Sequence, residues 1–409
     1  MENRVINAAI LGAGTVGGGV YKLAQAMEED IFHKTGARLV IKKMLVRNVN
    51  KERKGIPSEI LTDDWNSIIN DPEIDIIVEL MGGITPAKKY VIEALNAGKQ
   101  VVTANKDLLA EYGEEVMSAA EKSGNDLQFE AAVAGAIPII RPLKQSMAGN
   151  HITEVMGIVN GTTNYILTKM TEKGMDYADA LAEATELGYA EADPTADVEG
   201  YDACRKIAIL SSLMFGKNVD SEKVPTEGIT KITAADFEYA NAAKYTIKLL
   251  GRSRAIDDDT AEVMVAPFML PKDHPLAMVY GVFNAVFVTG NMLGDSMYYG
   301  RGAGKLPTAS AVVSDVIDCA RHQGKVIMCF WDKEEVKLAD IGEAERSFFI
   351  RAKAGAEDAV TAAFPGGRVV HLKDRKEDFG YFTQSMKEKD FQAKYEALGE
   401  QMLGRIRLV

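Results

Sequence analysis

Hydrophobic and polar positions follow one pattern in the first 150 residues. Short apolar runs alternate there with stretches of helical periodicity, and the runs cover residues 5–11, 39–46, 74–80 and 100–103. Short, largely apolar runs are typical of strands buried on both faces, and their alternation with helices indicates a doubly wound parallel sheet. We therefore predict an α/β fold with a Rossmann-type, dinucleotide-binding domain over residues 1–150, completed by about residues 300–322.

The pattern changes at about residue 151. Longer helical stretches follow, at 176–187 and 202–215, and then strands rich in Val and Phe, at 262–268 and 281–289. This order predicts a second, α+β domain over residues 151–299. A Gly-rich turn at 300–305 precedes a helix predicted over 308–320, and the charged residues 331–345 are interpreted as a linker.

The last segment has a pattern of its own. Its apolar periodicity predicts a strand, a helix, two strands, a helix and a final strand, over residues 347–352, 356–363, 368–372, 379–384, 388–399 and 403–409. A βαββαβ order of this size indicates a small ferredoxin-like module, which we place at residues 340–409.

Composition and charge exclude several classes of protein. The 409 residues carry a net charge of −12 and no long run of Lys and Arg, which argues against nucleic acid as a partner. No signal peptide and no apolar run long enough to cross a membrane is present, so a cytoplasmic protein is expected.

The five histidines are scattered singly, which excludes a zinc site of the usual local spacing. Cys204 could be a nucleophile, but a small buried residue is the more common role for an isolated cysteine.

A glycine motif follows the first predicted strand. The sequence GAGTVG places Gly12, Gly14 and Gly17 at the G-x-G-x-x-G positions, directly before a helical stretch. Gly12 permits a tight turn, Gly14 lets the backbone approach a pyrophosphate, and Gly17 lets the helix pack closely. We predict that these glycines, with Thr15 and Val16 between them, bind a dinucleotide.

The second predicted strand ends in basic rather than acidic residues. Arg47, Lys51, Arg53 and Lys54 stand where an acid usually binds the ribose 2′-hydroxyl of NAD, so NADP(H) is the preferred cofactor, with NAD(H) possible. A solvated basic loop is the alternative for the last three. Lys106 follows another predicted strand at the sheet edge that binds ligands, where a solvated lysine and a lysine beside the nicotinamide are comparably common.

The stretch LGYAEADPTADVEGYDACRK, residues 187–206, concentrates carboxylates just before a lysine. The carboxylates are Glu191, Asp193, Asp197, Glu199 and Asp202, and the lysine is Lys206. Lys206 lies four residues after Asp202 in a predicted helix, so the two side chains share a face. A lysine held in this way could act as an acid in hydride-transfer chemistry, but taken alone the pair is more often an ordinary surface ion pair at a helix start.

Four motifs together closely resemble homoserine dehydrogenase, over residues 1 to about 322. They are NGTTNYILTKM (160–170), the acidic stretch 187–206, VVTANK (101–106) and GRGAGKLPTASAVVSDV (300–316). The resemblance implies reduction of aspartate 4-semialdehyde to homoserine with NADPH or NADH, in the pathway to threonine and methionine. It also implies a homodimer or homotetramer built through the domain at 151–299, and a form without an aspartate kinase domain.

The resemblance assigns roles to single residues. Lys206 is expected to be the proton donor, and Lys106 a second lysine at the substrate and nicotinamide. The implied substrate contacts are Thr162, Glu191, Asp197 and Asp202, with Glu191 and Asp197 facing the ammonium group. Gly188 and Gly304 are expected to close over the cofactor.

Two further features of the resemblance concern a cation and an effector. FEAAVAGAIPII (129–140) resembles the family's monovalent-cation loop, with the Glu130 side chain and the carbonyls of Val133, Gly135 and Ile137 as ligands for Na⁺ or K⁺. By itself this stretch would be interpreted as a buried connection. The tail resembles a threonine-sensing, ACT-like module, but RAKAGAEDAV (351–360) lacks the usual acid-x-Pro-Gly signature, which makes threonine feedback doubtful.

Two rival interpretations remain open from the sequence. The first is a dinucleotide sensor that has lost catalysis, which the presence of both lysines and the carboxylates opposes. The second is another amino-acid or semialdehyde dehydrogenase of related architecture. A phosphorylating semialdehyde dehydrogenase would need a catalytic cysteine, and no cysteine here stands in the sequence context of a nucleophile.

Overall fold

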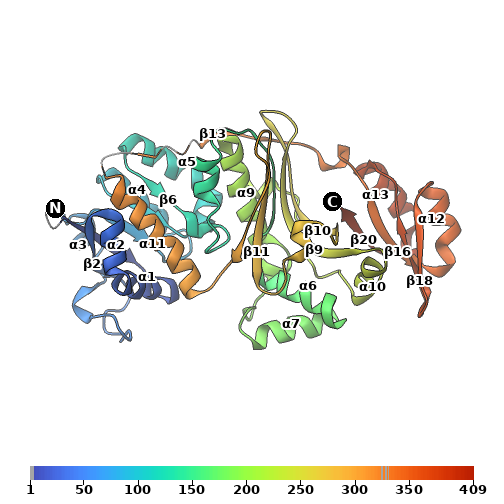
Figure 1. Ribbon diagram of the computed structural model, residues 1–409, viewed down its shortest axis with the longest axis horizontal. Coiled ribbons are helices and arrows are strands. Elements are labelled where there is room, and N and C mark those ends of the chain that lie inside the picture. The colour runs from blue at the N-terminus through green and yellow to red at the C-terminus, as the bar shows by residue number, and fades with distance from the viewer. Residues whose placement is uncertain (1–3, 324–325, 328, 330) are drawn as a thin grey trace. The chain divides into compact units, whose positions relative to one another are not determined.

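The chain folds into two units, each assembled from separate stretches of sequence. Unit 1 comprises Met1–His151, Ala208–Ser221 and Gly300–Val336, and unit 2 comprises Ile152–Ile207, Glu222–Tyr299 and Lys337–Val409. The computed structural model describes residues 4–323, 326–327, 329 and 331–409. In Figure 1 the blue and teal segments and the orange helix α11 belong to unit 1.

Unit 1 is built on a parallel sheet in which the four predicted strands are present. They are β1 (Arg4–Leu11), β2 (Ala37–Leu45), β4 (Ile76–Glu79) and β5 (Gln100–Thr103), with the short β3 (Leu61–Thr62) and β6 (Leu127–Gln128) at the edges. The order β3-β2-β1-β4-β5-β6 is that of a Rossmann sheet. Every residue of β4 and β5 is buried, including the polar Glu79, Gln100 and Thr103, as expected for strands inside a parallel sheet.

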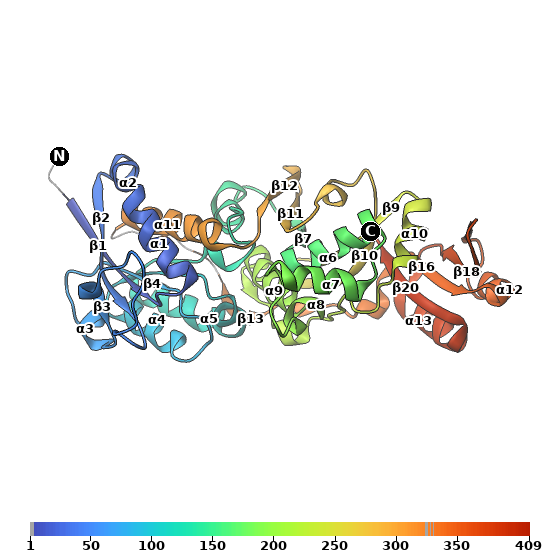
Figure 2. The ribbon, with the colours of Figure 1, turned by 90° about the horizontal axis from the view of Figure 1, so that it is seen from below.

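Helices cover both faces of this sheet (Figure 2). The helices α1 (Thr15–Ala26), α2 (Glu28–Thr35) and α11 (Lys305–Arg321) lie on one face, whereas α4 (Ala87–Asn96) and α5 (Lys106–Ser123) lie on the other. Ile10, Val20, Val78 and Val312 belong to one buried cluster, which joins α1 and α11 to the strands. The core of unit 1 is therefore completed by α11, a helix that lies in sequence between two stretches of unit 2.

The sheet of unit 2 begins as an antiparallel array. Its first strands, in spatial order, are β12 (Gly294–Arg301), β11 (Phe283–Gly290), β7 (Ile152–Ile158), β9 (Tyr245–Ala255) and β10 (Thr260–Pro271). The helices α6 (Gly161–Lys173), α7 (Tyr177–Glu186) and α10 (Ala234–Ala242) accompany it, and α6 contacts both β9 and β11. Met156, Leu250, Phe268 and Ala285 form its apolar core.

The tail has the predicted βαββαβ order but is not an isolated module. Its elements are β16 (Phe348–Lys353), α12 (Glu357–Ala363), β17 (Arg368–Leu372), β18 (Arg375–Phe382), α13 (Glu388–Ala397) and β20 (Met402–Leu408). Phe348, Val360, Phe379 and Phe391 form a core of their own. However, β20 pairs in parallel with β10, so the order continues as β10-β20-β16-β18-β17 in one sheet.

Residues 331–345, interpreted as a linker, do pass from unit 1 to unit 2, but they also contain strands that the sequence did not predict. Strand β13 (Asp332–Glu335) pairs with β8 (Lys217–Asn218), and β14 (Lys337–Leu338) pairs with β10. All four side chains of β13 are exposed, so the segment looks charged and irregular in sequence. Its backbone can still bond to a neighbouring strand, because ladder hydrogen bonds require no apolar side chain.

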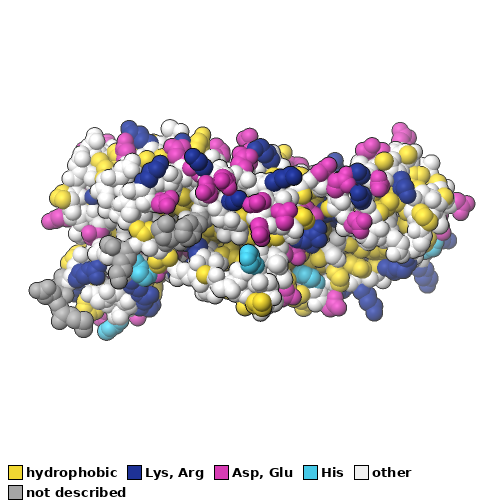
Figure 3. Space-filling model, turned by 90° about the horizontal axis from the view of Figure 1, so that it is seen from above, with side chains coloured by type: hydrophobic (Ala, Val, Ile, Leu, Met, Phe, Trp, Pro, Cys, Tyr) yellow, Lys and Arg dark blue, Asp and Glu magenta, His cyan; other side chains and the backbone are white. Residues whose placement is uncertain are grey.

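The surface carries charged side chains of both signs. On the face shown in Figure 3, acidic and basic side chains are both spread over the surface, and no continuous basic stripe forms. Within the described residues, no helix is both long enough and apolar enough to cross a bilayer.

Candidate active site

The Gly-rich turn of unit 1 has the geometry that its sequence predicts. Gly12 has φ +102°, and a Cβ added there would lie 2.7 Å from the carbonyl oxygen of Leu80. A Cβ on Gly17 would overlap the carbonyl oxygen of Gly12, whereas a Cβ on Gly14 would meet no atom within 4 Å. The open space in front of Gly14, at the N-terminus of α1, leaves room for a pyrophosphate.

A cavity of about 700 Å³ extends from this turn. Gly12 and Gly14 line it, together with Arg47, Lys51 and Arg53 from the predicted basic loop. The guanidinium of Arg53 donates to the backbone oxygens of Asn48 (3.1 Å) and Lys51 (2.7 Å), which folds the loop back on itself. Asp63, which the sequence analysis did not select, lines the cavity too, whereas Lys54 does not.

Lys106 begins helix α5 at the carboxyl edge of the sheet, and a buried network fixes this helix end. Asn105 caps the helix by accepting from the Leu108 N–H (3.1 Å), and its own N–H donates to the Thr103 hydroxyl oxygen (3.0 Å). Thr103 in turn donates to the carboxylate of Glu79 (2.7 Å). Glu79 is fully buried, and this burial raises its pKa. Glu79 lies in the predicted strand 74–80, but no local pattern marked it as a site residue.

The proposed cation loop is held by Glu130 of unit 1. One carboxylate oxygen accepts from the N–H groups of Ile139 (2.6 Å) and Ile140 (2.7 Å), and the other accepts from the N–H of Arg141 (2.9 Å). The N–H of Glu130 itself donates to Asp315 of α11 (2.8 Å). The side chain predicted to bind an ion therefore also caps a backbone turn.

The middle of the same loop needs glycine. Gly135 has φ +57°, and a Cβ there would overlap the carbonyl oxygen of Gly302. The neighbouring Ala136 N–H donates to the carbonyl of Arg301 (3.2 Å). The loop is thus packed against the GRGAGK segment, and Val133 and Ile137 are buried.

The acidic segment of unit 2 brings Asp202 and Lys206 together, as their spacing predicts. Both lie on α9 (Tyr201–Phe215), and the Lys206 ammonium donates to the Asp202 carboxylate (2.6 Å). A second N–H of the ammonium donates to the carbonyl oxygen of Val159 (2.7 Å). The side chains of Lys206 and Asp202 are only 13% and 7% exposed, so this is not an ordinary surface pair.

Asn160 connects this pair to Asp197, and the sequence analysis did not select it. Its amide donates to the carboxylates of Asp197 (2.7 Å) and Asp202 (2.8 Å), while its amide oxygen accepts from the Thr163 N–H (2.9 Å). Asn160 is the N-cap of α6, and Asp197 lies on the short helix α8 (Thr195–Val198). One buried side chain therefore fixes two of the predicted substrate carboxylates relative to each other.

The remaining predicted residues lie at several places. Thr162 is buried and donates to the carbonyl oxygen of Tyr189 (2.7 Å), which ties α6 to the start of the acidic segment. Glu191 is exposed on that segment. Gly188 (φ +73°) follows α7 in unit 2, and Gly304 (φ +117°) precedes α11 in unit 1, both in backbone conformations that favour glycine.

Another part of the NGTTN motif has a structural role. The Asn164 amide donates to the backbone oxygens of Val279 (3.2 Å), Gly281 (3.0 Å) and Phe283 (3.0 Å), which anchors the turn before β11. The buried Lys248 donates to the Asn164 amide oxygen (3.1 Å), and burial lowers the pKa of Lys248 to about 7. The motif therefore supports both the site and the sheet.

Sequence comparisons agree with these observations over both units. Residues 12–130 match the family described as homoserine dehydrogenase, NAD binding domain, and residues 138–317 match the family described as homoserine dehydrogenase. A homoserine dehydrogenase of Mycobacterium bovis is 46% identical over 388 residues, which cover 92% of this chain and 87% of that protein. One of Bacillus subtilis is 47% identical over 315 residues, covering 77% and 72%.

Solved structures give the same result. A homoserine dehydrogenase from Thiobacillus denitrificans has a TM-score of 0.91 and 37% identity, covering 99% of this chain and 98% of that one. A hyperthermophilic archaeal homoserine dehydrogenase in complex with NADPH has a TM-score of 0.65 and 28% identity, covering 77% of this chain and 97% of that one. With the Gly-rich turn of unit 1 and the lysine–carboxylate cluster of unit 2, these likenesses show that the chain belongs to the homoserine dehydrogenases, a family of NAD(P)-dependent oxidoreductases.

Proposed function

We propose that this chain reduces L-aspartate 4-semialdehyde to L-homoserine with NADPH, reversibly, as a step towards threonine and methionine. The observation that carries the proposal is the buried cluster of Lys206, Asp202, Asn160 and Asp197, whose contacts span 2.6–2.8 Å. It combines an acid that can serve an alkoxide with carboxylates that can hold an ammonium group. Reduction of an amino-acid aldehyde needs both the acid, which protonates the new alkoxide, and the carboxylates, which hold the ammonium group.

Lys206 is the proton donor in this proposal. A lysine ammonium has three N–H bonds, and two of them donate to Asp202 and Val159. The third is left for the carbonyl oxygen of the substrate, where it stabilises the forming alkoxide and then protonates it. Asp202 orients the ammonium, and Lys106 serves as a second lysine near the same oxygen.

The carboxylates and Thr162 hold the substrate. Glu191 and Asp197 bind its ammonium group, and the Asn160 amide keeps Asp197 in place. Thr162 donates its proton to Tyr189, so its oxygen lone pairs remain for a polar group of the substrate. Holding the substrate at two ends fixes the orientation of its carbonyl carbon, which lowers the entropic cost of the reaction.

The cofactor half supports NADPH, with NADH possible. The bound nicotinamide supplies the hydride, and Gly12, Gly14, Thr15, Val16 and Gly17 form the turn proposed for its pyrophosphate. The basic residues at the far end of the cavity suit a 2′-phosphate, because guanidinium groups bind phosphate oxygens in pairs. Gly188 and Gly304 are proposed to close over the cofactor.

Arg47→Ala should raise the KM for NADPH about tenfold and leave the KM for NADH nearly unchanged, since a charge-assisted hydrogen bond contributes about 1.5–3 kcal/mol. Steady-state kinetics with both cofactors measure this split. Lys54→Ala is the matched control, because Lys54 belongs to the same loop but does not line the cavity. Equal effects of Arg47→Ala on the two cofactors would contradict a 2′-phosphate contact.

The reaction itself is tested by NADPH oxidation with aspartate 4-semialdehyde in the presence of K⁺ or Na⁺. Turnover that yields homoserine supports the proposal. NADPH binding without turnover would favour the dinucleotide sensor instead. The phosphorylating alternative is disfavoured by geometry, because Cys204 and Cys319 are buried and burial raises the pKa of the Cys319 thiol.

The cation loop fits a monovalent ion in a limited way. A carboxylate has about four lone-pair positions, and three backbone N–H groups use three of those on Glu130. One position remains, and together with the carbonyls of Val133, Gly135 and Ile137 it would form a hard oxygen set that suits Na⁺ or K⁺. Among the described residues no cluster of His, Cys, Asp and Glu could hold a metal ion.

We expect the melting temperature of the protein to be higher in K⁺ or Na⁺ salts than in a choline salt. Glu130→Gln should reduce this difference.

The assembly and the tail remain proposals. We propose a homodimer or homotetramer built through the domain at 151–299, which the mass in solution would decide. The tail, proposed as an ACT-like module at 340–409, has a ferredoxin-like element order but no acid-x-Pro-Gly signature at 351–360. Threonine titration during turnover would show whether it senses threonine. A cytoplasmic location stays a prediction.

A further inference from the structure

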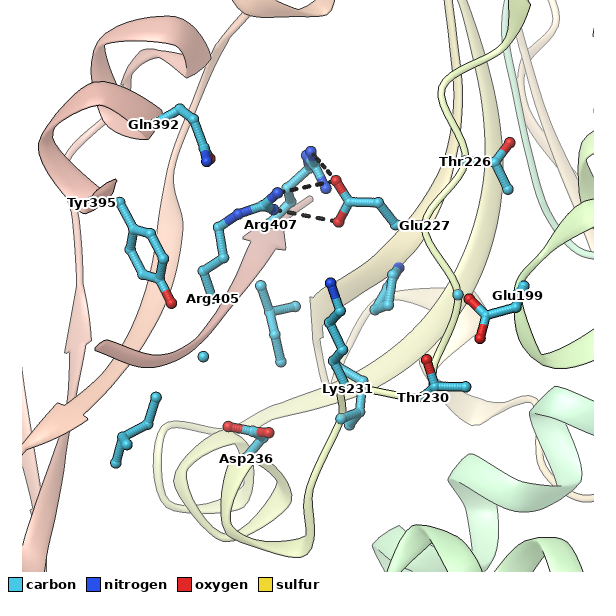
Figure 4. Close-up of a pocket in the computed structure, with 16 residues that line it drawn as sticks. Glu199, Thr226, Glu227, Thr230, Lys231, Asp236, Gln392, Tyr395, Arg405 and Arg407 are labelled. Atoms are coloured by element: carbon cyan, nitrogen blue, oxygen red, sulfur yellow. Dashed lines mark hydrogen bonds and ion pairs between the residues drawn. The ribbon is translucent and has the colours of Figure 1, made fainter. Parts of the chain in front are cut away.

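Unit 2 contains a second cavity, of about 510 Å³, that none of the predicted site residues lines. It lies between the loop 226–232, strand β20 and helix α13 (Figure 4). Its polar lining comes from elements far apart in sequence, and includes Glu199, Lys231, Tyr395 and Arg405. A cavity of this size is large enough for a small metabolite.

One wall of the cavity is the end of a chain of ion pairs. The pairs run, in order, through Arg254, Glu262, Arg346, Glu388, Arg407, Glu227 and Arg405. Arginine and glutamate alternate, and arginine stands at both ends, so this chain has one positive charge in excess. Arg346, Glu388 and Arg407 are buried. The excess charge is therefore available at the two ends, one of which is Arg405 in the cavity.

Glu227 is fully committed to this chain. It accepts from Arg407 (2.8 Å) and from Arg405 (3.1 Å), as the dashed lines of Figure 4 show. Burial opposes its ionisation, but the hydrogen bond and the charge of Arg407 outweigh burial and hold the pKa of Glu227 at about 2. Its one carboxylate is therefore shared by two arginines and is not available to a third cation.

That third cation is Lys231, and a carboxylate stands apart from it. Lys231 points from the loop towards Arg405 and Glu227, whereas Glu199 lies beyond Thr230 on the other side (Figure 4). Within the part of the chain that the structure describes, neither Lys231 nor Glu199 forms an ion pair. The cavity thus presents uncompensated positive charge on one side and a negative charge on another.

We propose that this cavity binds a small zwitterionic α-amino acid. Lys231 and Arg405 bind its carboxylate, Glu199 binds its ammonium group, and Thr230 and the Tyr395 hydroxyl are available for its side chain. The site lies within unit 2, between the loop 226–232 and strand β20. It is separate from residues 351–360, where the signature of a threonine-sensing module would stand.

The loop that carries Lys231 touches the acidic segment next to Asp197. The Ile229 N–H donates to the carbonyl oxygen of Val198 (2.8 Å), and a Cβ on Gly228 would overlap that same oxygen. An amino acid that orders the loop therefore acts on backbone adjacent to Asp197. We expect occupancy to change the KM for the semialdehyde more than kcat, and this part of the inference rests on the proposed function.

The binding test uses calorimetric titration of the full chain with the proteinogenic L-amino acids and, as probes lacking one charge, their N-acetyl and amide derivatives. At least one amino acid should bind saturably, and both derivatives should bind about tenfold more weakly or not at all. Lys231→Ala and Glu199→Gln should each weaken that binding about tenfold, because each removes one charge-assisted contact. Lys272→Ala is the control, since Lys272 is exposed and lies outside the cavity.

Two results would overturn the site. The first is that no amino acid binds; the second is that binding survives Lys231→Ala unchanged, which would place the ligand elsewhere, such as at the substrate carboxylates. Titration of a Lys206→Ala protein separates the cavity from the catalytic cluster, because binding in the cavity should persist there. Calorimetry requires no turnover, so its outcome is independent of the dehydrogenase assay. If the KM for the semialdehyde were unchanged with the ligand bound, the proposed coupling to the substrate site would be refuted, but the binding site itself would stand.

Discussion

Lys206→Ala should lower kcat by about 10²- to 10⁴-fold, the usual contribution of a positioned general acid, with NADPH affinity nearly intact. The physical reason is that the alkoxide formed by hydride transfer would lose both the nearest positive charge and the source of its proton. The Asp202 carboxylate would also lose its cation in a buried setting, while the Asn160 amide would remain. Steady-state turnover and a fluorescence titration of NADPH measure the two parts.

Lys206→Arg separates charge from proton transfer. Arginine restores a positive charge beside Asp202, but it keeps its proton at every accessible pH and cannot serve as the acid. It should therefore remain nearly as inactive as the alanine variant. Lys173→Ala, which changes a more exposed lysine in the same unit, is the control. Near-normal turnover of the alanine variant would show that Lys206 takes no part in the chemistry. Recovery of turnover with arginine would show that its role is electrostatic and not proton transfer.

Gly17→Ala should weaken cofactor binding and destabilise unit 1, whereas Gly14→Ala should weaken binding without destabilising the unit. The added methyl of Gly17→Ala overlaps the carbonyl oxygen of Gly12, so helix α1 must move away from the turn. Overpacking of this kind costs about 1–3 kcal/mol or more. The methyl of Gly14→Ala meets no protein atom within 4 Å and enters only the space proposed for the pyrophosphate.

The two glycine variants are each other's control. Thermal unfolding should show a lowered melting temperature for Gly17→Ala. For Gly14→Ala the free energy of unfolding should change by less than about 1 kcal/mol. Both should raise the KM for NADPH. If Gly14→Ala bound NADPH as well as the unaltered protein, the pyrophosphate would not lie against this turn. An unchanged melting temperature for Gly17→Ala would show that α1 can shift without cost.

Local hydrophobic periodicity predicted those elements in which apolar side chains recur at regular positions. Strand β5 has the predicted bounds, Gln100–Thr103, because both of its faces are buried and every residue is part of the signal. Strand β17 at Arg368–Leu372 was likewise predicted with its observed bounds. Strand β13 was missed, because its side chains are all exposed and only its backbone pairs. Such pairing leaves no trace in hydrophobicity.

Contacts within one helix were predictable, and contacts between elements were not. The spacing of Asp202 and Lys206 brings them together on any α-helix. Asn160 reaches Asp197 and Asp202 across 37 and 42 residues, so its role depends on how α6 packs beside the acidic segment. Glu79 reaches Thr103 only because β4 and β5 are neighbours in the sheet. A side chain whose partners come from elsewhere has no local pattern.

The sequence by itself determined the glycine turn, the alternation of strands and helices, and the lysine four residues after an aspartate, because each depends on backbone geometry over a few residues. Only the tertiary structure decided that the tail continues the sheet of unit 2 and that a chain of ion pairs ends in a cavity. Arg407 meets Glu227 across 180 residues. Such charges are compensated, or left in excess, only when packing brings distant segments into contact.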